Sequence, residues 1–245
     1  FISKRMTQFL GRTSQLALSA TIMALKDANV SMANINKGRT GVFMGTTMGE
    51  RPLEESIDTL IREGAEKMDK MKVLQSSANN ISANIAHYYK FTGPNYLIPT
   101  ACAAGNYAIG YGADLIRAGD IDYAVAGGAD SFSKFAFSGF HRLYAMASEK
   151  CQPFDKNRKG MIVGEGAGIL LLESLDSALK RKADIYAEIL GYGISCDAFH
   201  ITTPHMAGIE NAILKALKDA GVEKEEVDYI CSHGTGTPNN DKAEC

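Results

Sequence analysis

Short apolar runs alternate with segments of helical spacing along this chain of 245 residues. The run at residues 121–126 suits a central strand, because its side chains are mostly apolar or β-branched. The spacing of Leu16, Ala20 and Met23 is instead typical of a helix. The alternation favours an α/β fold in which helices cover a mixed sheet. We expect helices over residues 13–28, 77–89, 103–118 and 207–220, an amphipathic charged segment over 52–70, and strands over 39–44, 95–98, 121–126, 161–172, 185–194 and 227–231.

One heptapeptide occurs almost twice. Residues 24–30 read ALKDANV and residues 216–222 read ALKDAGV, so six of the seven positions agree. Each copy precedes a predicted strand that ends near a Gly-Thr pair, Gly45-Thr46 in the first case and Gly234-Thr235 in the second. The repeat indicates a duplicated αβ unit, and a coincidence between common helix residues is the alternative.

Composition and charge exclude several classes of function. The chain has 26 Lys and Arg against 28 Asp and Glu, so it lacks the basic field that gathers nucleic acid. No apolar run reaches the roughly 18 residues of a membrane span, and the start has no signal-peptide pattern, so we expect a cytoplasmic protein without a membrane segment. The five cysteines include no CxxC pair, which argues against disulfides and zinc. The Phe at position 1 and the unclosed ending DKAEC lead us to expect an internal piece of a longer protein.

Cys102 is the first candidate for chemistry. It lies in TACAAG, between the strand predicted at 95–98 and the helix predicted at 103–118. A helix N-terminus lowers a thiol pKa and offers N–H donors to a developing oxyanion. The sequence context is therefore that of a nucleophile, and the alternative is a small buried apolar residue.

His233 is the second candidate. It opens HGTGTPNND, a run of turn formers and hydroxyls at the end of a predicted strand, where α/β sheets place ligands. A structural histidine is the alternative. Cys231 and His233 lack further ligands at suitable spacing, so we expect no metal site. The glycines of VGEGAG at 163–168 precede a strand and lack the dinucleotide spacing, so they indicate a packing turn.

Five segments together resemble the β-ketoacyl-acyl-carrier-protein synthases, the condensing enzymes of fatty-acid and polyketide assembly. They are TACAAG at 100–105, VAGGAD at 125–130, PFDKNRKGMIVGEGAG at 153–168, DAFH at 197–200 and HGTGTPNND at 233–241. The resemblance implies a thiolase-like layered αβαβα fold with two pseudo-repeated halves, incomplete here and truncated at both ends. Residues 1–184 would form the N-terminal half, and residues 185–245 would open the C-terminal half.

The resemblance also implies roles for individual residues. Cys102 would be the acyl-accepting nucleophile, His233 the first of two active-site histidines, and Glu244 the acidic residue that supports the site. By resemblance, Thr235 and Thr237 would supply the hydroxyls that bind the pantetheine arm. Met48 would be the gate of the acyl pocket, and Phe140 the mobile aromatic near the nucleophile. Lys4 and Arg5 would be the basic residues that dock the carrier protein. Plain surface charge is an equal alternative for Lys4 and Arg5.

The implied reaction is a decarboxylative Claisen condensation. An acyl group on Cys102 would react with malonyl-acyl-carrier protein to give 3-oxoacyl-acyl-carrier protein, without a metal or redox cofactor. The implied partners are an acyl carrier protein with its phosphopantetheine arm, acyl and malonyl thioesters, and a second copy in a homodimer. The family's lysine, second histidine and glycine-rich segment would follow Cys245, so this piece alone should be inactive.

Two departures and two alternatives remain. Lys159 and Met161 replace acidic and aromatic residues common in the family, which affects packing near the VGEGAG turn. A thiolase-type acyltransferase acting on coenzyme A thioesters is one alternative, against which the HGTGT run counts. A non-catalytic partner subunit is the other, against which the retained Cys102 counts.

Overall fold

The structure is a computed structural model that describes residues 2–200 and 202–245. The chain divides into two compact units. The first comprises Phe1–Phe135 and Gly164–Tyr186, and the second comprises Ala136–Val163 and Ala187–Cys245.

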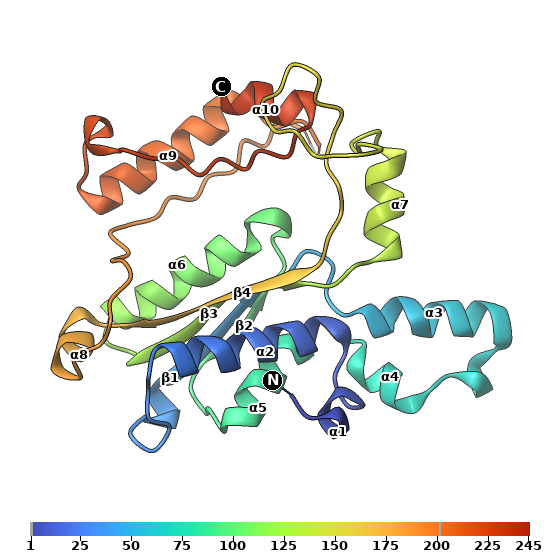
Figure 1. Ribbon diagram of the computed structural model, residues 1–245, viewed down its shortest axis with the longest axis horizontal. Coiled ribbons are helices and arrows are strands. Elements are labelled where there is room, and N and C mark those ends of the chain that lie inside the picture. The colour runs from blue at the N-terminus through green and yellow to red at the C-terminus, as the bar shows by residue number, and fades with distance from the viewer. Residues whose placement is uncertain (1, 201) are drawn as a thin grey trace. The chain divides into compact units, whose positions relative to one another are not determined.

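A four-stranded mixed sheet forms the centre of the first unit (Figure 1). Its order is β2 (Asn95–Ile98), β1 (Thr40–Gly45), β3 (Tyr123–Asp130) and β4 (Gly166–Glu173). Strands β2 and β3 run parallel to β1, whereas β4 runs antiparallel to β3. All six residues of β1 are buried, as expected of a strand with neighbours on both edges and helices on both faces. The predicted mixed sheet is therefore confirmed in this unit.

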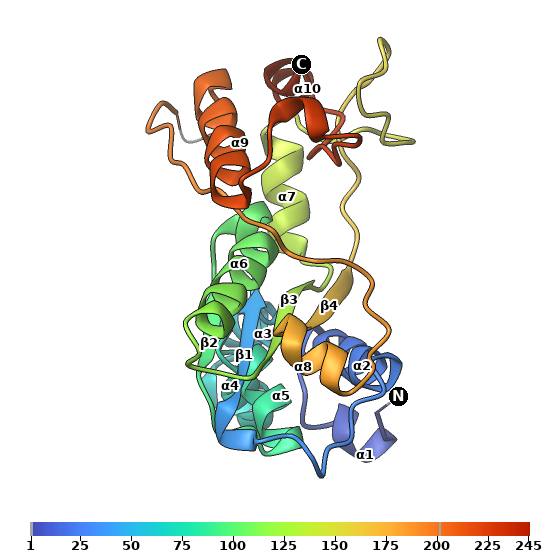
Figure 2. The same cartoon turned by 90° about the vertical axis from the view of Figure 1, so that its left-hand side faces the viewer.

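Helices cover both faces of this sheet (Figures 1 and 2). Helices α2 (Arg12–Asp27) and α5 (Asn80–Tyr89) pack on one face, and α6 (Ala104–Arg117) packs on the other. Side chains alternate along β1, so Val42 and Met44 join the core beneath α2 and α5, whereas Phe43 joins the core beneath α6. Each such fully buried side chain contributes about 1.5–3 kcal/mol to folding.

Small residues let α6 lie close to the sheet. An added Cβ on Gly112 would approach the Cβ of Ala124 to 3.1 Å and the ring of Phe43 to 3.3 Å. A Cβ on Gly45 would come within 2.3 Å of the Ala104 carbonyl carbon. The close approach explains why a helix tolerates glycines that cost about 1 kcal/mol each relative to alanine.

Smaller elements complete the first unit. They are α1 (Lys4–Thr7), η1 (Lys37–Arg39), α3 (Arg51–Glu63), η2 (Ala65–Lys67), α4 (Lys70–Gln75), η3 (Ala101–Ala103) and α8 (Leu175–Lys180). The segment expected over 52–70 is thus two helices and a turn, because Gly64 with φ of 96° ends α3. Helix α5 begins at Asn80, three residues later than expected, after a turn in which Asn80 N–H donates to the Ser77 carbonyl.

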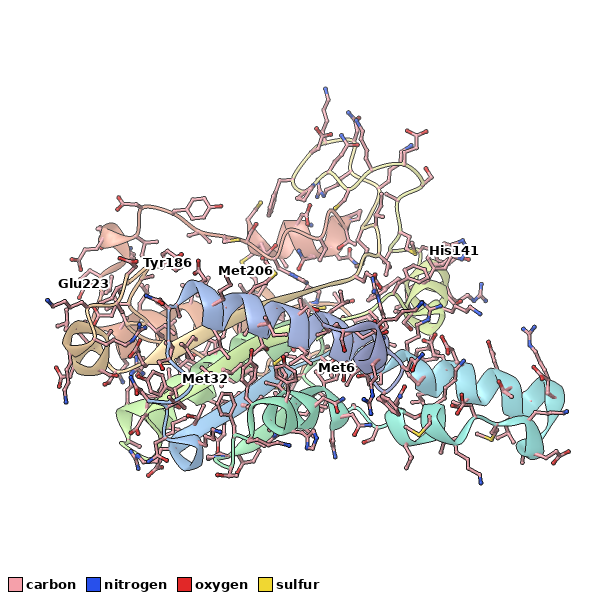
Figure 3. The ribbon with its side chains drawn as sticks, turned by 60° about the horizontal axis from the view of Figure 1, so that its bottom comes forward. Met6, Met32, His141, Tyr186, Met206 and Glu223 are labelled. Carbon is pink, nitrogen blue, oxygen red and sulfur yellow. The ribbon has the colours of Figure 1, made fainter. Side chains whose placement is uncertain are left out.

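Side chains from a distant segment hold the C-terminal end of α2. At its C-terminus the Arg181 guanidinium donates to the Ala28 carbonyl at 2.8 Å, and the Tyr186 hydroxyl donates to Asp27 at 2.8 Å. Figure 3 labels Tyr186 beside this end of the helix, with Met6 and Met32 in the segments that flank α2 on either side. Met6 and Met32 both pack against the core cluster that α2 shares with the sheet.

The second unit contains fewer regular elements. Helix α7 (Lys134–Arg142) begins in the first unit and continues into the second, and α9 (Met206–Ala220), η4 (Lys224–Glu226) and α10 (Pro238–Glu244) follow. His205 caps α9 through Nδ1, which accepts from Ala207 N–H at 3.2 Å, and Gly221 with φ of 65° ends the helix. Figure 3 labels Met206 at the start of α9 and Glu223 after its end.

Two expected strands are wrong. Residues 185–194 and 227–231 belong to no strand in the structure. Their apolar, β-branched composition expresses a local preference, but a strand also requires a ladder of backbone hydrogen bonds with a neighbouring strand. The strand expected at 161–172 is shorter than its apolar pattern, since β4 begins only at Gly166.

Neither a membrane span nor a metal centre emerges from the described residues. No helix among them is long and apolar enough to cross a bilayer. In the same part of the chain, no group of three or more His, Cys, Asp or Glu side chains could hold a metal ion.

Candidate active site

Cys102 opens onto a cavity at one end of the sheet of the first unit. The cavity has a volume of about 390 Å³. Its lining comes from the carboxyl ends of β1 and β3, the start of the antiparallel β4, and the first turn of α6. These are Gly45, Thr46, Thr47, Ala101, Cys102, Ala104, Gly105, Gly128, Ala129, Asp130, Gly166, Ala167 and Gly168. Because ligands of α/β proteins bind beyond the carboxyl ends of parallel strands, the cavity is a candidate active site.

The backbone presents Cys102 at a sharp turn. Ala101 has φ of 52°, in the left-handed region that a residue with a Cβ rarely adopts. Such a conformation costs about 1–3 kcal/mol and occurs preferentially at functional sites. Cys102 follows in the 3-10 turn that leads directly into α6, and it is exposed. The positive end of the helix dipole favours both a thiolate and an oxyanion at this position.

The loop after β1 forms another part of the cavity wall. Asp130, at the end of β3, accepts from Thr46 Oγ1 at 2.9 Å, from Thr47 N–H at 2.9 Å and from Met48 N–H at 3.0 Å. The backbone of the proposed gate residue Met48 is therefore tied to a neighbouring strand. Sequence reasoning included Asp130 in the VAGGAD segment but gave it no role. An acidic residue at the carboxyl end of a central strand could have marked it as a candidate site residue.

A buried carboxyl group lies at the end of the same loop. Glu50 is only 3% exposed, and its Oε1 accepts from Ser14 N–H at 2.9 Å and from the Ser14 hydroxyl. Burial raises the pKa of Glu50, and the bonds from Ser14 lower it in part. Sequence reasoning missed Glu50, because its burial depends on α2 packing against the loop.

Glu244 organises the loop that carries His233 in the second unit. Its carboxylate accepts from His233 N–H at 2.7 Å and from Gly234 N–H at 2.9 Å. Asn240 donates to the same carboxylate at 2.8 Å. The structure thus places Glu244 against the backbone of His233 and leaves the His233 side chain exposed.

Asp241 connects the histidine loop with an earlier segment of the second unit. It is 1% exposed, and it accepts from Gly236 N–H at 3.1 Å and from Phe154 N–H at 2.7 Å. Arg158 forms an ion pair with the same carboxylate at 3.3 Å. Between these contacts the hydroxyls of Thr235 and Thr237 lie 2.8 Å apart. The two hydroxyls are therefore adjacent and hydrogen-bonded to each other.

The remaining expected residues lie elsewhere in their units. Lys4 and Arg5 are exposed on α1 in the first unit. Phe140 is half-buried on α7, within the second unit. Figure 3 labels His141, which follows Phe140 on this helix. Cys102 and Met48 belong to the first unit, whereas His233, Thr235, Thr237 and Glu244 belong to the second.

The VGEGAG segment forms packing contacts. Glu165 pairs with Arg12 at the start of α2 and accepts from Phe132 N–H at 3.2 Å. The hydrogen bonds from Arg12 and Phe132 hold the pKa of Glu165 below its usual range. The segment therefore joins β4 to α2 and to the residues after β3.

Comparisons with known proteins agree on one family. The model of the beta-ketoacyl synthase N-terminal domain matches residues 1–178, and that of the C-terminal domain matches residues 186–245. The 3-oxoacyl-[acyl-carrier-protein] synthase 2 of Vibrio cholerae is 36% identical over 254 residues, which cover 100% of this chain and 61% of that protein.

Solved structures give the same result. A chain of the ishigamide ketosynthase/chain length factor is 45% identical with a TM-score of 0.93, and the match covers 96% of this chain and 59% of that chain. A chain from a complex of a type II PKS acyl-carrier protein with its ketosynthase is 31% identical with a TM-score of 0.90, covering 95% of this chain and 61% of that one. The chain thus spans about three fifths of the length of these relatives.

Proposed function

Because this chain belongs to the beta-ketoacyl synthase family, we propose that Cys102 is the nucleophile of a decarboxylative Claisen condensation. The observation that carries the proposal is the placement of an exposed thiol at the tip of α6, in a cavity at the carboxyl ends of β1 and β3. A thiolate at a helix N-terminus is stabilised, and the same dipole stabilises the oxyanion formed when it attacks a carbonyl.

The first stage is acyl transfer. The Cys102 thiolate attacks the carbonyl carbon of an acyl thioester, and the tetrahedral intermediate collapses with departure of the carrier's thiolate, which takes up a proton. The acyl group is then held on Cys102 as a new thioester.

The second stage forms the carbon–carbon bond. Malonyl-acyl-carrier protein loses carbon dioxide, and the electron pair of the broken bond forms an enolate. His233 donates an N–H to the enolate oxygen, which requires a neutral imidazole. The enolate carbon attacks the acyl thioester, the Cys102 thiolate departs, and 3-oxoacyl-acyl-carrier protein results. A second histidine from elsewhere in the protein would donate another N–H to the same enolate oxygen.

Other residues support these steps in the proposal. Glu244 fixes the backbone at His233, as its two hydrogen bonds to that loop indicate. Thr235 and Thr237 bind the pantetheine arm, and Met48 and Phe140 shape the acyl pocket. Residues 1–184 form the N-terminal half and residues 185–245 open the C-terminal half, which is supported by the ranges of the two family models.

We also propose an acyl carrier protein as partner. A matched ketosynthase was solved with its acyl-carrier protein, which supports this assignment. Lys4 and Arg5, exposed on α1, would contact the acidic carrier. The protein would act as a homodimer in the cytoplasm, in fatty-acid or polyketide synthesis.

The first experiment measures thiol reactivity in the full-length protein. All five cysteines are exposed, so accessibility alone does not distinguish Cys102 from the other four. We expect iodoacetamide and an acyl thioester to modify Cys102 about tenfold faster than the other cysteines, because the helix tip raises its thiolate fraction. Peptide mapping by mass spectrometry gives each rate. Equal rates at Cys102 and Cys196 would show that the assignment is wrong.

The second experiment measures decarboxylation. His233→Ala in the full-length protein should slow release of labelled carbon dioxide from malonyl-carrier by about 10²–10³-fold, the usual effect of removing one oxyanion donor. His87→Ala, which changes an exposed histidine on α5, is the matched control and should leave the rate unchanged. An unchanged rate in His233→Ala would remove this histidine from the mechanism.

A further inference from the structure

The loop after β1 is held by one carboxylate. Asp130 Oδ1 accepts from the Thr46 hydroxyl and from the N–H groups of Thr47 and Met48, and Oδ2 lies 3.1 Å from the same Thr47 nitrogen. Bonds to a charged acceptor are stronger than neutral ones, and all of them converge on a half-buried side chain. Successive N–H groups therefore point at one anion that the protein itself supplies.

The same loop is closed by a ring of buried hydroxyls. The Thr46 hydroxyl accepts from Gly49 N–H at 3.0 Å, and the Gly49 carbonyl accepts from the Thr13 hydroxyl at 2.7 Å. The Thr13 hydroxyl lies 2.9 Å from that of Ser131, which follows Asp130 in the chain. The ring of hydroxyls and the carboxylate together restrain the loop, because each buried donor would lose its partner if the loop moved.

The loop and Asp130 also form part of the cavity that contains Cys102. Thr46, Thr47 and Asp130 line the cavity together with Cys102 and Ala104. The position of the loop backbone therefore fixes one dimension of the space beside the thiol. A change in that backbone would alter the shape of the cavity without touching the sulfur atom.

We propose that Asp130 is a positioning residue that determines which acyl groups Cys102 accepts. By holding the Thr46–Met48 backbone, it sets the width of the cavity next to the nucleophile. This inference rests on the proposed function, since it assumes that the acyl group on Cys102 enters this cavity. The role is distinct from catalysis, because Asp130 acts through the loop and not on the reacting atoms.

The variants follow from the hydrogen bonds. Asp130→Asn places an NH₂ group where one carboxylate oxygen now lies, beside the Thr47 N–H, so a donor faces a donor. Thr46→Val keeps the shape of the side chain but removes the hydroxyl that joins Asp130 to Gly49. Thr46→Ser keeps that hydroxyl and is the matched control.

The experiment compares initial rates of Cys102 acylation by a short-chain and a long-chain acyl thioester in the full-length protein, with intact-mass detection. We expect Asp130→Asn and Thr46→Val to change the ratio of the two rates by about tenfold, the effect of losing one charged hydrogen bond. Thr46→Ser should keep the wild-type ratio within about twofold. Hydrogen exchange at residues 46–49 should accelerate in the same two variants.

Other outcomes overturn the inference. An unchanged ratio in both variants, whether or not the two rates fall together, would show that Asp130 has no part in selecting the acyl group. Failure of both variants to fold would assign Asp130 to stability alone. Absence of acylation at Cys102 in the wild type would instead contradict the proposed function. The three results are distinguishable in one set of measurements.

Discussion

Glu50 and Asp130 hold the two ends of one loop, and their surroundings differ. Asp130 accepts hydrogen bonds from three groups, so its charge is compensated. Glu50 Oε1 accepts from the N–H and the hydroxyl of Ser14, the Thr13 backbone at the start of α2 adds a further bond, and Oε2 is without a side-chain partner among the described residues. A buried, partly compensated carboxylate is costly, so burial shifts the titration of Glu50 towards its neutral form and raises its pKa.

The pKa of Glu50 predicts a pH dependence of stability. Burial raises this pKa from its ordinary value of 4.5, so between pH 4.5 and the folded-state pKa Glu50 holds its proton more often in the folded protein than in the unfolded chain. Stability should therefore fall as the pH rises above 4.5 towards the folded-state pKa, and should be unaffected by this group below 4.5. Thermal unfolding between acidic and neutral pH checks this.

Glu50→Gln separates this effect from other titrations. The variant mimics the neutral carboxyl group, so its melting temperature should fall less steeply with rising pH than that of the wild type. Glu63→Gln, which changes an exposed carboxylate on α3, should follow the wild-type curve. Parallel curves for wild type and Glu50→Gln would contradict a raised pKa at this position.

At the scale of elements, close contact between α6 and the sheet determines where Cys102 stands. Gly45 ends β1 directly beneath the first turn of α6, and the Gly128 nitrogen lies 3.7 Å from the position of a Cβ on Gly105. Helix and strands meet through backbone atoms at this end. The tip of α6, and with it the thiol, is therefore located by glycines on both sides.

Gly45→Ala should displace that tip. The new Cβ would lie 2.3 Å from Ala104 carbon and 2.4 Å from its oxygen, so the helix must move. We expect destabilisation by about 1–3 kcal/mol, the usual cost of overpacking, together with slower alkylation of Cys102. Urea unfolding and mass spectrometry measure the two effects.

Gly168→Ala is the matched control for this prediction. Gly168 lines the same cavity from β4, but nothing lies within 4 Å of an added Cβ there. The variant should keep the wild-type stability within about 0.5 kcal/mol, as expected of a substitution without steric conflict. Equal effects of the two substitutions would show that the contact at Ala104 does not position the helix.

At the scale of the whole molecule, each unit has its own means of cohesion. The first unit folds around two apolar clusters on either face of its sheet. In the second unit, Asp241 joins residues 154 and 158 to the loop at residue 236 through a buried carboxylate. The expected thiolase-like fold is confirmed by the likeness to the ketosynthase/chain length factor structure, with 45% identity and a TM-score of 0.93.

Asp241→Ala should therefore loosen the second unit alone. The substitution removes the carboxylate that accepts from Phe154 N–H and Gly236 N–H and pairs with Arg158. Amide hydrogen exchange at Phe154 and Gly236 should therefore accelerate about tenfold or more. Exchange in β1 of the first unit should remain unchanged. Glu225→Ala, at an exposed carboxylate, is the control. An equal acceleration of hydrogen exchange in both units would show that Asp241 does not act on the second unit alone.

The sequence by itself determined the alternation of elements, the mixed α/β class and the candidate residues. Helical spacing and turn formers are local properties, so α2, α6, α9 and the strands β1 to β3 could be placed within a few residues. Cys102 and His233 were found because each lies in a local pattern of small residues and turn formers between predicted elements.

Tertiary structure decided what depends on distant partners. Residues 185–194 and 227–231 have strand composition, yet they are not strands, because a ladder needs a neighbour that local sequence does not specify. The roles of Glu50, Asp130 and Asp241 arise from contacts with residues 36, 84 and 87 positions away, respectively. Burial and hydrogen-bond partners are properties of packing, and only the folded chain brings these groups together.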